Sequence, residues 1–176
     1  GTIELLPGCI FVFGGDAVDK GDGDLEVLAD LVGLKKRYPD RVHLILGNRD
    51  TNKLRLLEEL DRDDHPGVFW GYSMGGSEVT PDQFRQARGQ PWGRPERLRW
   101  ILWQTMGARA PDAFESRRQE LARMGQAHSD EAVADSFAQM VQPGGLMYEY
   151  IRLGELAVHY PGVLFVHGAV TPENVG

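Results

Sequence analysis

Three short segments of the sequence hold side chains that can bind a metal ion or a phosphate group. They are residues 14–21 (Gly-Gly-Asp-Ala-Val-Asp-Lys-Gly), residues 47–50 (Gly-Asn-Arg-Asp) and residues 167–168 (His-Gly). The carboxylate of Asp16, the amide oxygen of Asn48 and the imidazole of His167 form a mixed oxygen and nitrogen ligand set. Such a set suits hydrolytic ions such as Mn²⁺, Zn²⁺, iron or Mg²⁺. The neighbouring glycines let the backbone approach a ligand closely because they have no Cβ.

Each of these segments directly follows an apolar run that predicts a buried β-strand. The runs are residues 9–13 (Cys-Ile-Phe-Val-Phe), 42–46 (Val-His-Leu-Ile-Leu) and 163–166 (Val-Leu-Phe-Val). Continuous apolar character without alternation is typical of strands covered on both faces, as in an α/β sheet. Ligands of open α/β sheets bind beyond the carboxyl ends of the strands. We therefore expect Asp16, Asn48 and His167 to converge at one edge of a sheet.

The remaining periodicity predicts the elements that position these segments. A helix over residues 24–38 joins the first two strands into a right-handed βαβ unit. A short helix over residues 51–60, with Asp50 or Thr51 as its N-cap, follows the second strand. Residues 65–92, rich in Gly, Pro and Ser, predict a long connection. Helices are then predicted over residues 97–106, 113–124, 131–141 and 147–153, and residues 156–160 form a hairpin with 163–166 that turns at Pro161-Gly162.

The composition is that of an ordinary globular protein. The 176 residues fit one domain, with 41% hydrophobic and 26% charged residues. The net charge of −7 argues against a general nucleic-acid or membrane-surface binder. No apolar stretch reaches the roughly eighteen residues of a membrane span. Because Cys9 lies in an apolar run, we expect its thiol to be buried and unreactive. Because it is the single cysteine and no signal peptide is visible, we expect a cytoplasmic location.

Three motifs resemble those of the calcineurin-like metallophosphoesterases. Residues 15–21, Gly-Asp-x-x-Asp-Lys-Gly, resemble the family's Gly-Asp-x-x-Asp-Arg-Gly, and residues 47–50 resemble its Gly-Asn-His-Asp/Glu. Residues 165–172 resemble the His-Gly-Gly-Leu-Ser-Pro segment of the serine/threonine phosphatase and dinucleoside-tetraphosphatase branches. The resemblance implies a partial αββα sandwich of the metallophosphoesterase type. It also implies a hydrolase that cleaves phosphate monoesters or phosphoanhydrides by attack of a metal-bridging hydroxide.

The resemblance also implies the roles of individual ligands. Asp16 takes the position of the carboxylate that bridges two metal ions, and Asn48 and His167 take the positions of ligands to the second ion. The ions implied are manganese, iron, zinc or magnesium, two in the complete enzyme. No Asp-x-His precedes Gly15 and no Gly-His follows His167, where the family's opening and closing motifs stand, so we expect this sequence to hold at most one ion. The substrate implied is a phosphorylated small molecule or a phosphoprotein.

Two positions of the phosphate-binding part depart from the family's pattern. Lys20 stands in place of a phosphate-binding arginine and can act as a point charge toward phosphate. Arg49 stands in place of the histidine that acts as general acid, which Asp19 would orient. An arginine does not release its proton at working pH. The hypothesis is that Arg49 instead pairs with Asp19 and clamps a phosphoryl oxygen, which suits leaving groups that are already acidic.

Two interpretations of the missing motifs stay open. Either the sequence is an internal portion of a longer enzyme, or it is a relative that has lost catalysis and binds a phosphorylated ligand or a protein partner with the same fold. Within a single domain of residues 1–176, residues 66–145 are predicted to form a helical insertion that caps the active edge. Three tryptophans and three arginines in residues 92–103 suggest a lid that stacks a base and grips phosphates. The alternative is an amphipathic helix with tryptophan in the core and arginine in water.

Overall fold

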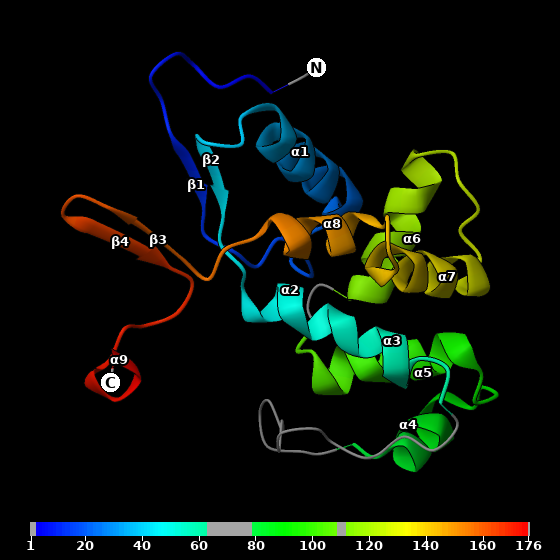
Figure 1. Cartoon of the computed structure of the whole chain (residues 1–176). Coiled ribbons are helices and arrows are strands. Elements are labelled where there is room, and N and C mark those ends of the chain that lie inside the picture. Colours follow the sequence, from blue (N-terminus) through cyan, green and yellow to red (C-terminus); the bar gives the residue numbers. More distant parts are fainter. Residues whose placement is uncertain (1–2, 63–78, 109–111, 176) are drawn as a thin grey trace.

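The computed structural model describes residues 3–62, 79–108 and 112–175 of the chain (Figure 1). In chain order its elements are β1 (Phe11–Phe13), α1 (Asp24–Arg37), β2 (Val42–Leu44), α2 (Asn48–Asn52), the 3₁₀ turn η1 (Lys53–Arg55), α3 (Leu56–Glu59), α4 (Pro81–Arg88), α5 (Arg94–Trp100), the π-helical turn η3 (Ile101–Thr105), α6 (Ala113–Arg123), α7 (Asp130–Val141), α8 (Leu146–Leu153), β3 (Ala157–Tyr160), β4 (Val163–Val166) and α9 (Pro172–Val175). The predicted α/β class is confirmed. No helix in these described ranges is long and apolar enough to cross a membrane.

The predicted βαβ unit is present at the start of the chain. β1 and β2 pair in parallel, with Phe11 opposite Val42 and Phe13 opposite Leu44. Helix α1 connects them; acidic residues lie in its first turn and basic residues in its last turn, which complements the helix dipole. Beyond β2, Ile45 forms a parallel bridge with Glu155. Because these segments run in the same direction, the loops after β1 and β2 lie at the same edge.

The hydrophobic core lies between this unit and the helices. Among its largest fully buried side chains are Trp100 of α5, Phe114 of α6, Phe137 of α7 and Tyr150 of α8. Burying side chains of this size contributes roughly 1.5–3 kcal/mol each. The hydroxyl of Tyr150 donates to the carbonyl oxygen of Ile45 at 3.0 Å, so the core also anchors the end of β2.

The hairpin forms where it was predicted, but its surroundings differ from the prediction. β3 and β4 are antiparallel, and Gly162 in the turn has φ +82°. They form a sheet of their own instead of joining β1 and β2, and Figure 1 shows the hairpin projecting away from the helices. Leu164 is 51% exposed and Phe165 is 36% exposed. The prediction that residues 163–166 are buried on both faces is therefore wrong, because the hairpin does not join the β1–β2 sheet that packs against the helices.

Three other expectations also need correction. Cys9 is exposed rather than buried, since it precedes β1 instead of belonging to it. Helix α4 forms inside the segment predicted as a connection. The hydroxyl oxygen of Thr80 accepts a hydrogen bond from the backbone N–H of Gln83, and the backbone N–H of Thr80 donates to the side-chain oxygen of Gln83. Gly89 ends the helix in the left-handed conformation. Residues 65–78 of that predicted connection lie outside the described residues.

The arginine-rich helix buries both a tryptophan and an arginine. Trp100 is buried in the core, and its indole N–H donates to the carbonyl oxygen of Val79 at 2.8 Å. Arg97 is also buried and donates from Nη1 to the carbonyl oxygen of Leu60 at 2.7 Å. The interpretation of an amphipathic helix is therefore confirmed for Trp100, which lies in the core, and is wrong for Arg97, which does not lie in water. This arginine joins α5 to the end of α3.

Candidate metal and phosphate site

A buried carboxylate joins the loops that follow β1 and β2. Asp50 accepts hydrogen bonds from the backbone N–H groups of Asp16 (2.9 Å), Ala17 (2.8 Å) and Gly47 (2.8 Å). Burial raises the pKa of Asp50 above its ordinary value, against the effect of these amides. Asp50 is the third residue of α2, which begins at Asn48 after the N-cap Gly47, so the predicted cap at Asp50 or Thr51 is wrong. The carboxylate fixes the first loop to the start of this helix.

The loop after β1 has an unusual backbone conformation. Asp16 has φ +57° and Asp19 has φ +74°, in the left-handed region that residues with a Cβ seldom adopt. Such conformations persist where surrounding contacts fix them, and they cluster at functional sites. Here the contacts come from Asp50, which holds the amide of Asp16, and from Asp24, which holds the amide of Asp19.

Two glycines let the three strand ends meet. A Cβ on Gly15, which has φ +90°, would lie 2.7 Å from Nδ1 of His167. A Cβ on Gly47 would overlap Oδ1 of Asp16 and would lie 2.9 Å from Cε1 of His167. Both distances are shorter than real Cβ contacts. Gly15 and Gly47 are therefore required by the close approach of these side chains.

The three predicted metal ligands converge. Nε2 of His167 lies 3.3 Å from Oδ1 of Asp16 and 3.3 Å from Oδ1 of Asn48. Nδ1 of His167 lies 2.8 Å from the carbonyl oxygen of Gly14. A carbonyl only accepts, so Nδ1 carries the proton, and in the neutral ring the Nε2 lone pair faces the two oxygens. The prediction of convergence is confirmed, although His167 reaches the other ligands from a separate sheet.

This donor set fits one divalent cation. Three lone-pair atoms that face one another repel unless a positive charge lies among them, and a backbone carbonyl on the far nitrogen is the usual support of a metal-ligating histidine. Asp16 and His167 are 29% and 27% exposed, so an ion can enter from solvent. In the described ranges no three His, Cys, Asp or Glu side chains gather as a metal site. The site therefore depends on the amide of Asn48.

Arg49 and Asp19 do not pair with each other. The backbone N–H of Arg49 donates to Oδ1 of Asp16 at 3.1 Å, and its Nε lies 3.4 Å from Oδ2 of Asp16. The Nη1 atom of Arg49 is buried without a hydrogen-bond partner. Asp19 instead pairs with Lys53 at 2.5 Å, and both side chains have 0% exposure. The predicted pairing of Arg49 with Asp19 is therefore wrong, and Lys20 on the same loop is exposed.

Sequence reasoning missed Lys53. It lies four residues after Arg49, one helical turn on, and its Nζ also lies 3.4 Å from the carbonyl oxygen of Arg49. This spacing was the available signal, since residues four apart share one face of a helix. The spacing of Arg49 and Lys53 indicates a shared helix face only if the helix begins at Asn48, whereas the sequence predicted a start at Thr51.

The buried charges continue from Asp19 into the helices. Asp24 accepts from the amide of Asp19 at 3.2 and 3.3 Å and lies 3.6 Å from Arg117 of α6. Arg117 also lies 3.2 Å from Glu120, which accepts two backbone amides in the first turn of α1 at 2.7 and 3.1 Å. Burial raises the pKa of Asp24 to about 6, against the lowering effect of Arg117. The network connects the loop after β1 to α1 and α6.

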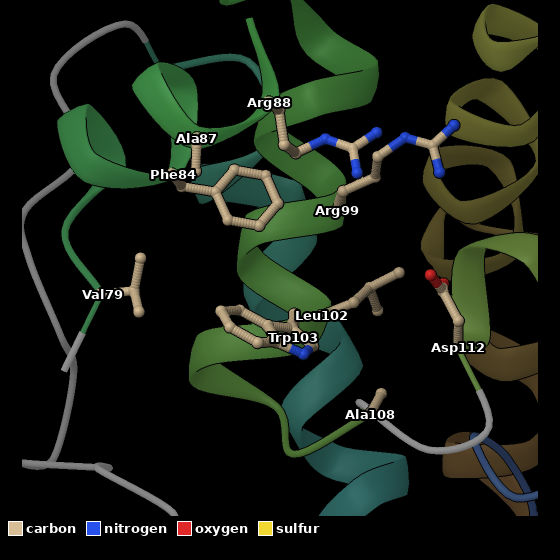
Figure 2. A pocket seen from close by; sticks show the side chains of 9 residues that line it. All are labelled: Val79, Phe84, Ala87, Arg88, Arg99, Leu102, Trp103, Ala108 and Asp112. Carbon is tan, nitrogen blue, oxygen red and sulfur yellow. The ribbon is translucent and has the colours of Figure 1, made fainter. Parts of the chain in front are cut away.

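A separate pocket of about 330 Å³ lies in the helical part of the chain (Figure 2). The rings of Phe84 and Trp103 line it, with centroids 5.8 Å apart, and Arg88 and Arg99 extend along one rim. Both guanidinium groups contact Glu96, at 2.5 and 3.1 Å. The pocket contains none of the predicted site residues. The hypothesis of a lid that stacks a base and grips phosphates stays a prediction.

Comparison with known proteins decides the family. Residues 7–109 match the family model described as calcineurin-like phosphoesterase. The chain belongs to the calcineurin-like phosphoesterase family. Its small sheets and helices form a partial metallophosphoesterase fold, and metallophosphoesterases generally use divalent metal ions. The predicted resemblance to this family is therefore confirmed, and the matched residues include the first two of the three motifs.

The chain also resembles curated serine/threonine phosphatases over short segments. It is 43% identical to serine/threonine-protein phosphatase 5 of Homo sapiens over 47 residues, which is 27% of this chain and 9% of the relative. It is 50% identical over 44 residues to serine/threonine-protein phosphatase sitA of Aspergillus fumigatus, covering 25% of this chain and 11% of the relative. With the serine/threonine-protein phosphatase 6 catalytic subunit of Drosophila melanogaster it shares 41% identity over 49 residues, 28% of this chain and 16% of the relative. The chain thus spans only a small part of the curated relatives it matches. No solved structure matches it significantly.

Proposed function

We propose that the chain carries part of the active site of a metal-dependent phosphoesterase that hydrolyses phosphate monoesters or phosphoanhydrides. The observation that supports this most directly is the meeting of Asp16, Asn48 and His167 at 3.3 Å. These residues would hold one Mn²⁺, iron, Zn²⁺ or Mg²⁺ ion. A bound ion of this kind supplies Lewis-acid stabilisation of the negative charge that develops on phosphoryl oxygens.

The chain's own residues have distinct tasks in this proposal. Arg49 has a buried Nη1 without a hydrogen-bond partner beside the ligand Asp16, so its guanidinium is placed to donate to a phosphoryl oxygen. Its charge then opposes the negative charge that grows there in the transition state. Asp50 keeps the two ligand loops together through its three amide contacts. Lys20, exposed on the first loop, adds a point charge toward an incoming phosphate.

We further propose that residues 66–145 form an insertion of the phosphoesterase domain that caps the active edge. Helices α4 to α7 support this, because they pack into the same hydrophobic core as the βαβ unit. Residues 66–78 and 109–111 of the proposed insertion lie outside the described residues. The substrate would be a phosphorylated small molecule or a phosphoprotein, and the named relatives are serine/threonine phosphatases.

One observation favours a second candidate, a catalytically inactive module of the same fold that binds a phosphorylated ligand or a protein. Arg49 already places a positive charge 3.4 Å from Asp16. This pairing neutralises the carboxylate in part without any metal ion. A module of this kind would bind an anionic ligand at this site without a metal ion.

An activity assay with a binding control separates the two candidates. The full-length protein with Mn²⁺ should hydrolyse p-nitrophenyl phosphate or a dinucleoside polyphosphate. Asp16→Asn should abolish this activity, whereas Asp30→Asn, at an exposed position of α1, should leave it unchanged. Absence of hydrolysis with Mn²⁺, Zn²⁺, Fe²⁺ and Mg²⁺ would overturn the enzyme proposal. Calorimetric binding of a phosphorylated ligand without metal, unaffected by His167→Ala, would support the module.

A further inference from the structure

The side chains around the ligand cluster differ in whether they can deliver a proton to a departing oxygen. Asp19 cannot face a substrate, because it is fully buried and bound to Lys53 at 2.5 Å. Lys53 is equally buried, and its second contact is the carbonyl oxygen of Arg49. The two charges therefore neutralise each other inside the protein. Neither is presented to the site.

The remaining groups of the ligand loops are also poor proton donors. Arg49 keeps its proton at working pH and lies against Asp16. Asp50 is buried and engaged by three backbone amides. The Nδ1 proton of His167 is directed at the carbonyl oxygen of Gly14, and its Nε2 faces the other two ligands. Among the described residues of these loops, only the exposed Lys20 is free of such contacts, and it acts as a point charge.

We infer that this site cleaves phosphoryl groups without side-chain protonation of the leaving oxygen, and that Lys53 enforces this by sequestering Asp19. This inference rests on the proposed phosphoesterase function and narrows its substrates. A bond forms between a water oxygen and phosphorus, and the water's proton passes to solvent. The bond from phosphorus to the leaving oxygen breaks, and its electron pair stays on that oxygen. The leaving group therefore departs as an anion, which favours phosphoanhydrides and aryl phosphates over alkyl phosphates such as phosphoserine.

Lys53 is a positioning residue in this scheme, because it acts through Asp19. Introducing a histidine at position 49 supplies a proton donor but no partner to orient it while Lys53 holds Asp19. The sequestered pair therefore predicts that Arg49→His alone brings little gain on alkyl phosphates. Arg49→His together with Lys53→Met, which releases the carboxylate and keeps an apolar side chain of similar length, should bring a larger gain.

The test is a substrate series measured with the full-length protein and Mn²⁺. Aryl phosphates of graded leaving-group acidity and a dinucleoside polyphosphate are compared with phosphoserine and ethyl phosphate. A general acid typically contributes about 10²–10⁴-fold. Without one, kcat/KM for the alkyl phosphates should fall below that of p-nitrophenyl phosphate by about that factor, with a steep dependence on leaving-group acidity. The double variant should raise the ratio of alkyl to aryl rates at least about tenfold, toward the contribution of a general acid.

Each result has a distinct meaning. No hydrolysis of any substrate overturns the proposed function itself. Hydrolysis of alkyl and aryl phosphates at similar rates leaves that function standing and overturns the inference. An equal gain from Arg49→His alone and from the double variant overturns the role of Lys53. Circular dichroism checks the fold of each variant, and if Lys53→Met does not fold, Lys53→Gln, which keeps a hydrogen-bond donor beside Asp19, replaces it in the double variant.

Discussion

Replacing Asp24 by asparagine should remove a pH dependence of folding that the buried charge network creates. Asp24 faces Arg117 and Glu120 of α6 and the amide and carboxylate of Asp19, which is itself paired with Lys53. Burial raises the pKa of Asp24 from 3.8 to about 6. Each pKa unit corresponds to about 1.4 kcal/mol, so up to about 3 kcal/mol of stability is linked to this proton.

The sign of the effect follows from the raised pKa. The folded protein binds the proton of Asp24 more tightly than the unfolded chain does. Its contribution to stability is therefore fully present below about pH 3.8 and is lost as the pH rises through about 6. Asparagine resembles the protonated acid in shape and does not ionise. Relative to the unmodified protein, Asp24→Asn should gain stability between pH 4 and pH 7 by about 2–3 kcal/mol.

Urea unfolding at half-unit steps from pH 4 to pH 7.5 measures this gain. Asp30→Asn is the matched control, because Asp30 lies on the same helix and is exposed. The free energy of unfolding of Asp30→Asn should stay within about 0.5 kcal/mol of that of the unmodified protein across this pH range. If the difference in free energy of unfolding between Asp24→Asn and the unmodified protein is also independent of pH, Asp24 ionises as in the unfolded chain. The reasoning from its burial is then refuted.

Three further predictions concern the ligand loops. Gly47→Ala should weaken Mn²⁺ binding in calorimetry at least tenfold, because its Cβ overlaps Asp16; Gly33→Ala, where a Cβ meets nothing within 4 Å, should not. Asp50→Asn should lower the free energy of unfolding by about 2 kcal/mol in urea, since it turns a donor toward backbone N–H groups; an unchanged midpoint would contradict this. His167→Ala should abolish Mn²⁺ binding, and the exposed control His128→Ala should leave it intact; equal binding by both would exclude His167 as a ligand.

The local sequence was sufficient to predict where the ligands meet. A strand, helix and strand within residues 9–46 must form a parallel pair, and parallel strands place their following loops at one edge. The role of the glycines before Asp16 and Asn48 could also be predicted from the sequence, because only glycine lets the backbone approach a ligand so closely. The capping box of Thr80 and Gln83 also indicates the start of α4, but the surrounding Gly and Ser residues favoured the interpretation of this segment as a loop.

The partners of the charged residues were decided only by the tertiary structure. Asp19 could pair with any nearby cation, and the choice of Lys53 over Arg49 depends on where α2 begins and which face it buries. The same holds for Arg117, which comes from a helix distant in sequence to reach Asp24. Exposure of the apolar hairpin likewise depends on which elements cover it. A periodic pattern specifies local conformation, whereas ion pairing and burial depend on contacts between segments far apart in the chain.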